Sequence, residues 1–230
     1  MLNLRRLSNN DPAIAQFGRL QESTYFDPEM LIPAAIIGQM LESNNAQRQN
    51  FLLVLEEADE VVAGTLFHYL ATDVGFSSYM AVAKTHRRQG LARQLHQARL
   101  ALLLETSRTL HGLFIDVVNP ARLTPAELEL EQRLGSDPWT RLQAFARLGF
   151  RRVDVAYVQP VGGADGGAVT NMDLLFCPLE LKDLIATKLV ADTMQAYWKP
   201  WLGAAVAKKE AQALAARASS EQIRLLPPND

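Results

Sequence analysis

The segment from Lys84 to Arg99 concentrates side chains that bind anions. It holds five Lys or Arg residues and two His but no Asp or Glu, although the whole chain has a formal net charge of −2. Gly90 and Ala92 are small, which lets the backbone there approach a ligand closely. A stripe of apolar residues at helical spacing follows, formed by Leu91, Leu95, Ala98 and Leu102. The pattern predicts a loop that opens a helix, and the free amides and dipole of a helix start suit a phosphate group.

Alternating apolar and polar residues predict the strands that hold this loop. The expected strands are Leu2–Leu7, Phe51–Glu56, Val61–Leu70, Phe76–Ala83, Leu113–Val118, Arg152–Val158 and Met172–Phe176. An acidic turn between the second and third predicts a hairpin. Helices are expected from Asp11-Pro12 to about Thr24, from Met30 to Leu41 after the capping signal Asp27-Pro28, from Gly90 onward, near Thr124–Glu127, and over Trp139–Leu148. The order predicts an α/β (α+β mixed) fold, in which helices pack on a mixed sheet.

Composition excludes several classes of protein. Hydrophobic residues make up 48% of the 230 residues and charged residues 21%, which is typical of a folded globular chain. The single cysteine, Cys177, cannot form an intrachain disulfide, so we expect a reducing cytoplasm. No apolar run approaches the length of a membrane span, and we expect neither a membrane nor a nucleic acid as partner.

Two motifs resemble the GNAT superfamily of acyl-CoA-dependent N-acetyltransferases. Arg87-x-x-Gly90-x-Ala92 is similar to the Arg/Gln-x-x-Gly-x-Gly/Ala signature of that family, and Tyr79–Val82 resembles its fourth strand. Ala144–Phe150 is similar to its late helix, which ends in Leu-Gly-Phe. The resemblance covers about residues 1–178 and implies a mixed, mostly antiparallel seven-stranded sheet flanked by helices. Residues 179–230 would then be a C-terminal helical extension with a loose tail.

The resemblance also implies the substrates and the residues that bind the cofactor. Acetyl-CoA would donate an acetyl group directly to a primary amine of a small molecule or peptide. The implied contacts are the loop residues Arg87, Arg88, Gln89, Gly90, Leu91, Ala92 and Arg93, the strand residues Met80, Ala81 and Val82, and also Asn119 and Phe145. Asn119 equally fits a turn before Pro120. No metal site is expected.

Proton transfer is where the chain departs from the family pattern. The position that commonly holds a tyrosine acid is Phe145, which has no proton to donate. Tyr79, Tyr157 or water would serve as the acid, or the thiolate would leave unprotonated. Asp116 is the first candidate for the base, and the other candidates are His68, Asp73 and the group Glu127, Glu129 and Glu131. A packed histidine and a solvated glutamate face are the structural alternatives, and Cys177 is expected to be a buried, unreactive thiol.

Other readings of the sequence remain open. Without an acid at position 145, the chain could be a non-catalytic acyl-CoA-binding module. The basic segment Lys84–Arg99 could be a nucleic-acid surface, although no aromatic residue is interleaved with its charges. Tyr197, Trp198 and Trp201 either dock the C-terminal helices on their own chain or form a partner surface, as in a homodimer.

Overall fold

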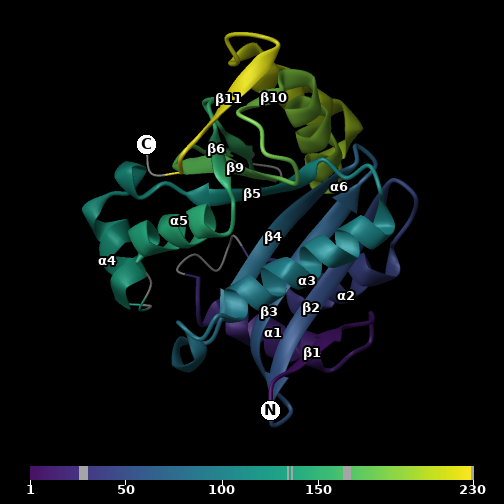
Figure 1. The fold of residues 1–230 in the computed structure, drawn as a ribbon, viewed down its shortest axis with the longest axis vertical. Helices are drawn as coiled ribbons and strands as arrows, with labels where there is room; N and C mark the ends of the chain where they lie inside the picture. The colour runs from purple at the N-terminus through teal and green to yellow at the C-terminus, as the bar shows by residue number, and fades with distance from the viewer. Residues whose placement is uncertain (26–30, 134, 136, 163–166, 229–230) are drawn as a thin grey trace. The chain divides into compact units, whose positions relative to one another are not determined.

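The computed structural model describes residues 1–230 except 26–30, 134, 136, 163–166 and 229–230 (Figure 1). The chain divides into two compact units. Unit 1 comprises Met1–Tyr69, Ser77–Thr109 and Pro125–Asp137, and unit 2 comprises Leu70–Phe76, Leu110–Thr124 and Pro138–Asp230. Strand β4 (Val74–Val82) therefore contributes its first residues to unit 2 and its later residues to unit 1.

Unit 1 is a sheet with helices on both faces. Its strands are β1 (Asn3–Arg6), β2 (Arg48–Glu57), β3 (Glu60–Leu70) and the later part of β4, and its helices are α1 (Ala13–Glu22), α2 (Ala34–Glu42), α3 (Leu91–Thr106) and α4 (Pro125–Arg133). Leu52 and Val54 of β2 share a buried cluster with residues of α1 and α2. Helix α3 covers the other face, as Figure 1 shows, and its buried Arg99 bonds to Ser77 of β4.

Local signals explain the elements of unit 1. Asp11 Oδ1 accepts a 2.9 Å hydrogen bond from the N–H of Ala13, so α1 begins where the sequence predicted. Ala58 and Asp59 both have positive φ, which is the geometry of a tight hairpin turn between β2 and β3. Helix α2 begins after Pro33 rather than at residue 30, and the capping signal expected at residues 27–28 lies outside the described residues.

Unit 2 is built on a second set of strands. They are the first part of β4, then β5 (Gly112–Val118), β6 (Arg151–Val153), β9 (Met172–Pro178), β10 (Leu184–Ala186) and β11 (Gln222–Leu226), with a separate hairpin of β7 (Gln159–Pro160) and β8 (Ala168–Val169). Its helices are α5 (Pro138–Arg147) and α6 (Thr187–Ala216). Strands β4 and β5 run parallel and pair from Val74↔Gly112 to Phe76↔Phe114, whereas the β5–β9, β6–β9, β6–β11 and β10–β11 pairs are antiparallel.

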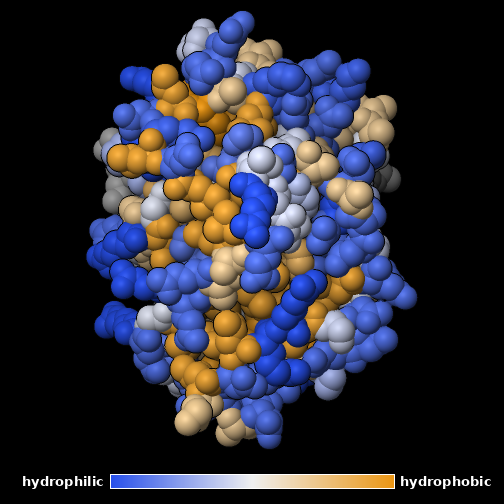
Figure 2. Space-filling model, turned by 45° about the vertical axis from the view of Figure 1, so that its right-hand side comes forward, coloured by the Kyte–Doolittle hydropathy of each residue, from blue (hydrophilic) through white to orange (hydrophobic). Residues whose placement is uncertain are grey.

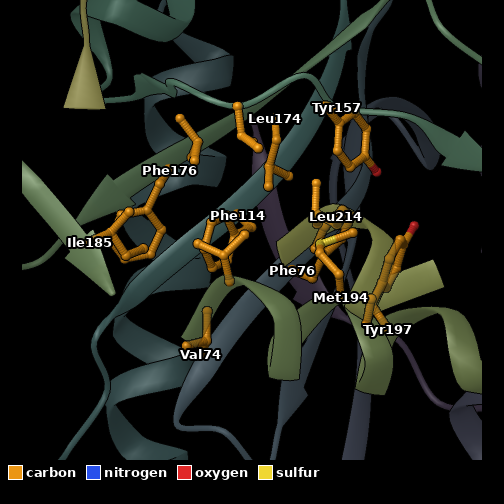
Figure 3. Close-up of a cluster of buried hydrophobic side chains, with 14 of the residues drawn as sticks. Val74, Phe76, Phe114, Tyr157, Leu174, Phe176, Ile185, Met194, Tyr197 and Leu214 are labelled. Carbon is orange, nitrogen blue, oxygen red and sulfur yellow. The ribbon is translucent and has the colours of Figure 1, made fainter. Parts of the chain in front are cut away.

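The core of unit 2 joins its strands to the C-terminal helix. Phe76 lies beside Met194 and Tyr197 of α6, and Phe114 and Phe176 belong to the same buried cluster (Figure 3). The Phe76 and Tyr197 rings stack with 3.5 Å between centroids. Because α6 supplies a large part of this core, residues beyond Pro178 are integral to unit 2.

The C-terminal segment corrects one expectation. The sequence predicted only helices after Pro178, but Leu184–Ala186 is strand β10 and Gln222–Leu226 is strand β11. Helix α6 runs through Pro200 and is interrupted at Gly203, whose φ of 76° and ψ of 163° are not helical. Among the described residues, the hydrogen-bonded strand order β1-β2-β3-β4-β5-β9-β6-β11-β10 contains nine strands, whereas the resemblance implied seven. The predicted mixed fold with a mostly antiparallel sheet and flanking helices is otherwise confirmed.

The surface mixes polar and apolar side chains. On the face drawn in Figure 2, hydrophobic residues form patches between hydrophilic ones. Among the described residues, every helix is too short or too polar to cross a lipid bilayer.

Candidate active site

The loop before α3 has a preformed, left-handed backbone. Lys84–His86 forms a single 3₁₀ turn, and Arg88 then takes a φ of 63° and Gly90 a φ of 82°. Helix α3 begins at Leu91, directly after this turn. A β-carbon built on Gly90 would have no heavy atom within 4 Å, so the space beside this residue is open. The predicted strand–loop–helix arrangement is therefore present, with the glycine where the backbone turns.

Arg87 fastens this loop to unit 1. Its Nε donates to the carbonyl of Val82 at 3.3 Å, and its Nη1 donates to the carbonyl of Gly135. The guanidinium therefore binds two backbone carbonyls, one at the end of β4 and one after α4. In this structure Arg87 positions the loop, whereas the sequence resemblance implied that it contacts the cofactor.

The side of the loop that faces solvent carries basic groups beside backbone amides. Arg88, Gln89, Gly90 and Arg93 are exposed, while Leu91 is buried and anchors the helix start. The first amides of an α-helix have no partner within the helix, and α3 is 16 residues long. Together these groups fit a diphosphate.

Part of the basic bias seen in the sequence is internal. Arg99 is fully buried, with Nη1 2.7 Å from Oγ of Ser77 and Nη2 2.9 Å from Nδ1 of His96. Neither residue reaches the loop surface. The charge available to a ligand is therefore smaller than the sequence count suggested.

Two backbone carbonyls near the end of β4 each accept a hydrogen bond from a side-chain hydroxyl. The Tyr25 hydroxyl donates to the carbonyl of Met80 at 3.3 Å, and the Thr65 hydroxyl donates to the carbonyl of Tyr79 at 2.9 Å. The Tyr79 ring packs edge-on against Tyr25, with 5.5 Å between centroids. Ala81 is buried, whereas Met80 and Val82 are half-buried. A carbonyl has two lone pairs, so these groups can still accept a second hydrogen bond.

A second group of polar side chains lies entirely within unit 2. The Tyr157 hydroxyl lies 3.0 Å from Oδ2 of Asp116 on β5 and also contacts Oε1 of Gln159. Nε1 of Trp198 donates to the same Oε1 at 3.1 Å. Burial raises the pKa of Asp116 to about 6, although the hydrogen bond from Tyr157 opposes this shift. Burial, reinforced by the nearby Asp116 carboxylate, also raises the pKa of Tyr157 well above its usual value.

Asn119 is held in a turn of unit 2. Its Oδ1 accepts from the N–H of Ala121 at 2.9 Å, and its Nδ2 donates to Asp173 at 2.8 Å. Arg122 completes the group with a 2.9 Å ion pair to Asp173. These contacts favour the turn-forming alternative over the implied contact with a cofactor.

The remaining candidates occupy varied environments. Phe145 of α5 is buried and packs edge-on against Phe150. Asp73 lies at the turn between β3 and β4 with a φ of 54°. Of the three glutamates, Glu131 is buried and Glu129 is exposed beside Arg133, so the expected common solvated face is wrong.

The structure confirms the expected burial of Cys177 and favours one of the two alternatives for the aromatic residues of the C-terminal helix. Cys177 is a buried free thiol on β9. Trp198 and Tyr197 are buried in the core of unit 2, and Trp201, 38% exposed, packs edge-on against Tyr197. The aromatic cluster therefore docks α6 on its own chain, and a homodimer stays a prediction.

The residues that sequence reasoning missed surround His68. This histidine is fully buried, with Nδ1 2.9 Å from Oδ1 of Asn50 and Nε2 2.7 Å from Oγ of Ser78. Burial, with a smaller contribution from the charge of Arg48, lowers the pKa of His68 well below its usual value. The alternation of His68 with apolar neighbours was visible in the sequence, but its two partners were not.

Comparison with known proteins shows what part of this chain is similar to a known family. Residues 14–122 match the model of the acetyltransferase (GNAT) family. A search of curated proteins found no match. Among solved structures, Ard1 from Thermoplasma volcanium aligns with a TM-score of 0.54 and 14% identity, over 78% of this chain and 99% of that one. The ribosomal-protein-S18-alanine N-acetyltransferase from Escherichia coli aligns with a TM-score of 0.50 and 15% identity, over 79% of this chain and 96% of that one.

At sequence identities of 14–15%, these structural matches support a similar fold and nothing more specific. The family match includes the turn at Arg88–Gly90, where both named residues have positive φ, and the start of α3. Through the segment 14–122, this chain is similar to the acetyltransferase (GNAT) family.

Proposed function

We propose that this protein transfers an acetyl group from acetyl-CoA directly to a primary amine of a small molecule or peptide. The observation that carries the proposal is the left-handed turn at Arg88 and Gly90, which leads into α3 with open space and basic side chains beside it. The match of residues 14–122 to an acetyltransferase family supports the same assignment.

The residues present fit a CoA diphosphate. The amides from Arg88 through Arg93 would bind the phosphate oxygens, and the Arg88 and Arg93 side chains would add charge. The backbone of Met80, Ala81 and Val82 would align the pantetheine arm and polarise the thioester carbonyl. Acetyl-CoA supplies the activated acyl group, and these residues supply its position.

Proton transfer is proposed for groups that the sequence already indicated. Asp116 is the proposed acceptor of the amine proton, because a carboxylate with a pKa of about 6 is ionised at neutral pH and is more basic than an ordinary aspartate. Tyr79 is the proposed proton donor. Cytoplasmic location is proposed with this activity.

Cofactor binding tests the loop assignment directly. Isothermal titration with acetyl-CoA should show binding to the wild type and none to Gly90→Glu, which places bulk and negative charge at the turn. Gly203→Glu is a matched control, because Gly203 also has a positive φ, of 76°, and open space beside it, but it lies in α6. Equal affinity of wild type and Gly90→Glu would exclude this loop as the site.

Turnover separates catalysis from binding. Thiol release from acetyl-CoA should accelerate with at least one amine in a panel of polyamines, amino sugars and peptides. Phe145, buried and without a hydroxyl, favours a second candidate: a non-catalytic module that binds acyl-CoA. That candidate predicts binding without turnover on any amine.

A further inference from the structure

The side chains of Asn50, His68 and Ser78 form a continuous array across three neighbouring strands of unit 1. Asn50 lies on β2, His68 on β3 and Ser78 on β4. The two hydrogen bonds that join them measure 2.9 Å and 2.7 Å. A hydroxyl bonded to an imidazole, which a third group orients, is the arrangement that activates serine nucleophiles.

The neighbours of Asn50 determine which way its amide points. Nε of Arg48, which can only donate, lies 2.9 Å from one amide atom of Asn50, so that atom is the oxygen. The amide nitrogen donates to the carbonyl of Met40 at 2.7 Å and to Oδ1 of Asn44 at 3.0 Å. Both sets of contacts agree, and the amide oxygen is the atom that faces His68.

The orientation of Asn50 fixes the proton on His68. Because the amide oxygen only accepts, Nδ1 of His68 carries the hydrogen and donates it. His68 is neutral, since burial lowers its pKa well below the usual value. Its Nε2 is therefore unprotonated and accepts a 2.7 Å hydrogen bond from the Ser78 hydroxyl.

The backbone of β4 is irregular at this point. Ser77 points to Arg99 of α3, whereas Tyr79 and Ala81 pack with the cluster of α1 and α2 on the other face. In a regular strand Ser77, Tyr79 and Ala81 would share a face, so the alternation breaks around Ser78 as it does at a β-bulge. Bulges are common beside active sites, and Ser78 is half-buried while Ser77 is fully buried.

We propose that Ser78 is a nucleophile, activated by His68 and Asn50, that accepts acyl groups from activated esters and thioesters. Ser78 Oγ would attack the acyl carbon while its proton passes to Nε2 of His68. The bond to the leaving alcohol or thiol breaks, and that group takes the proton from His68. Water then hydrolyses the acyl–serine ester, giving its proton through His68 to Oγ and releasing the carboxylic acid. This reaction is distinct from direct transfer to an amine and does not require the Arg88–Gly90 turn.

The environment of His68 sets the expected speed of this reaction. A desolvated imidazole beside Asn50, rather than beside a carboxylate, stabilises the transient imidazolium poorly. Acylation should therefore be slow but specific to Ser78.

An irreversible probe tests the proposal without any knowledge of the acceptor or of acetyl-CoA binding. A small alkyl fluorophosphonate forms an O–P bond with an activated serine as fluoride leaves, and the serine proton goes to the base. We expect one label per chain, located at Ser78 by fragment-ion mass spectrometry. Ser78→Ala should lose the label, and Ser77→Ala, a matched control one residue away, should keep it.

The base is tested by rate. His68→Gln, which can keep hydrogen bonds to both neighbours, should slow labelling by about a hundredfold, the usual scale for loss of a general base. Exposed Ser219 serves as an internal reference and should react far more slowly than Ser78. Absence of label on the wild type, labelling of Ser78 no faster than Ser219, or label that survives Ser78→Ala would overturn the proposal. The probe does not use acetyl-CoA. A failed cofactor titration would therefore not affect the labelling result, and a failed labelling experiment would not affect the proposed acetyl-CoA site.

Discussion

The Tyr157 hydroxyl lies 3.0 Å from Oδ2 of Asp116, and it is also in contact with Oε1 of Gln159. Both neighbours are acceptors when Asp116 is ionised, but a hydroxyl has only one hydrogen to donate. When Asp116 is protonated, it can donate to Tyr157, which then donates to Gln159. The protonated carboxyl thus completes the network, in line with the direction in which burial shifts its pKa.

Replacing Asp116 by asparagine should make the protein more stable at neutral pH. The pKa of Asp116 is raised from 3.8 to about 6 in the folded state, so stability linked to this group is full below about pH 3.8 and is lost as pH rises toward 6 and beyond. The amide that Asp116→Asn introduces cannot ionise, so the variant avoids this loss. We expect a gain of about 1–3 kcal/mol at pH 7.5 and almost none at pH 3.5, measured by urea unfolding.

Asp192→Asn is the control for the previous variant. Asp192 is paired with Lys188 on the surface of α6, and such pairs contribute little. A gain at pH 7.5 equal to that of Asp116→Asn would point to net charge, and not to burial, as the cause.

His68 should give the protein sensitivity to acid. Desolvation, then the charge of Arg48, lowers its folded-state pKa well below 6.5, so its contribution to stability is full above about pH 6.5 and declines as pH falls below that value. His68→Gln should flatten the dependence of unfolding free energy on pH between 7 and 5. His111→Gln, at an exposed histidine, is the control, and an equal flattening in that variant would show that burial of His68 is not the cause.

Truncation after Pro178 should unfold unit 2. The deletion removes β10, β11 and α6, and with them the buried side chains Ile185, Val190, Met194, Tyr197, Trp198, Leu214, Ile223 and Leu225. Phe76, Phe114 and Phe176 would then face water. Hydrogen exchange should show loss of protection in β5 and β9. Native protection there would instead support residues 1–178 as an independent domain.

Gly112→Ala should destabilise the pairing of β5 with β9. A β-carbon at this position would meet the Phe176 ring at 2.6 Å and 2.8 Å, as well as the carbonyl of Cys177. We expect a loss of about 1–3 kcal/mol, because backbone and a packed ring cannot move aside freely. Thermal unfolding measures it, and Gly203→Ala, where no atom lies within 4 Å, shows how much is due to backbone conformation alone.

The sequence predicted those parts of the fold that depend on neighbouring residues. The stripe of α3, the acidic hairpin turn and the cap at Asp11 are local signals, and each formed the expected element. Strand β11 was missed because five residues after a long helix carry too little periodicity to be distinguished from a tail. Strand β6 is shorter than predicted, since pairing ends at Val153.

The candidate site could be predicted only in part, for a similar reason. The turn at Gly90 follows from residues that are adjacent in the chain. His68 meets Asn50, 18 residues away, and Ser78, 10 residues away, while Tyr157 meets Asp116 across 41 residues. Such contacts depend on strand register and on a break in alternation, which composition and spacing do not specify.

Arg88 and Gly90 hold left-handed backbone angles as part of the folded chain, and Arg87 donates hydrogen bonds to the carbonyls of Val82 and Gly135. The turn thus loses its conformational freedom when the chain folds, and little remains to be lost when an anion arrives. An anion would bind to a turn that already has its final conformation. Its association rate should therefore depend on diffusion and salt concentration, with no slow rearrangement of the loop.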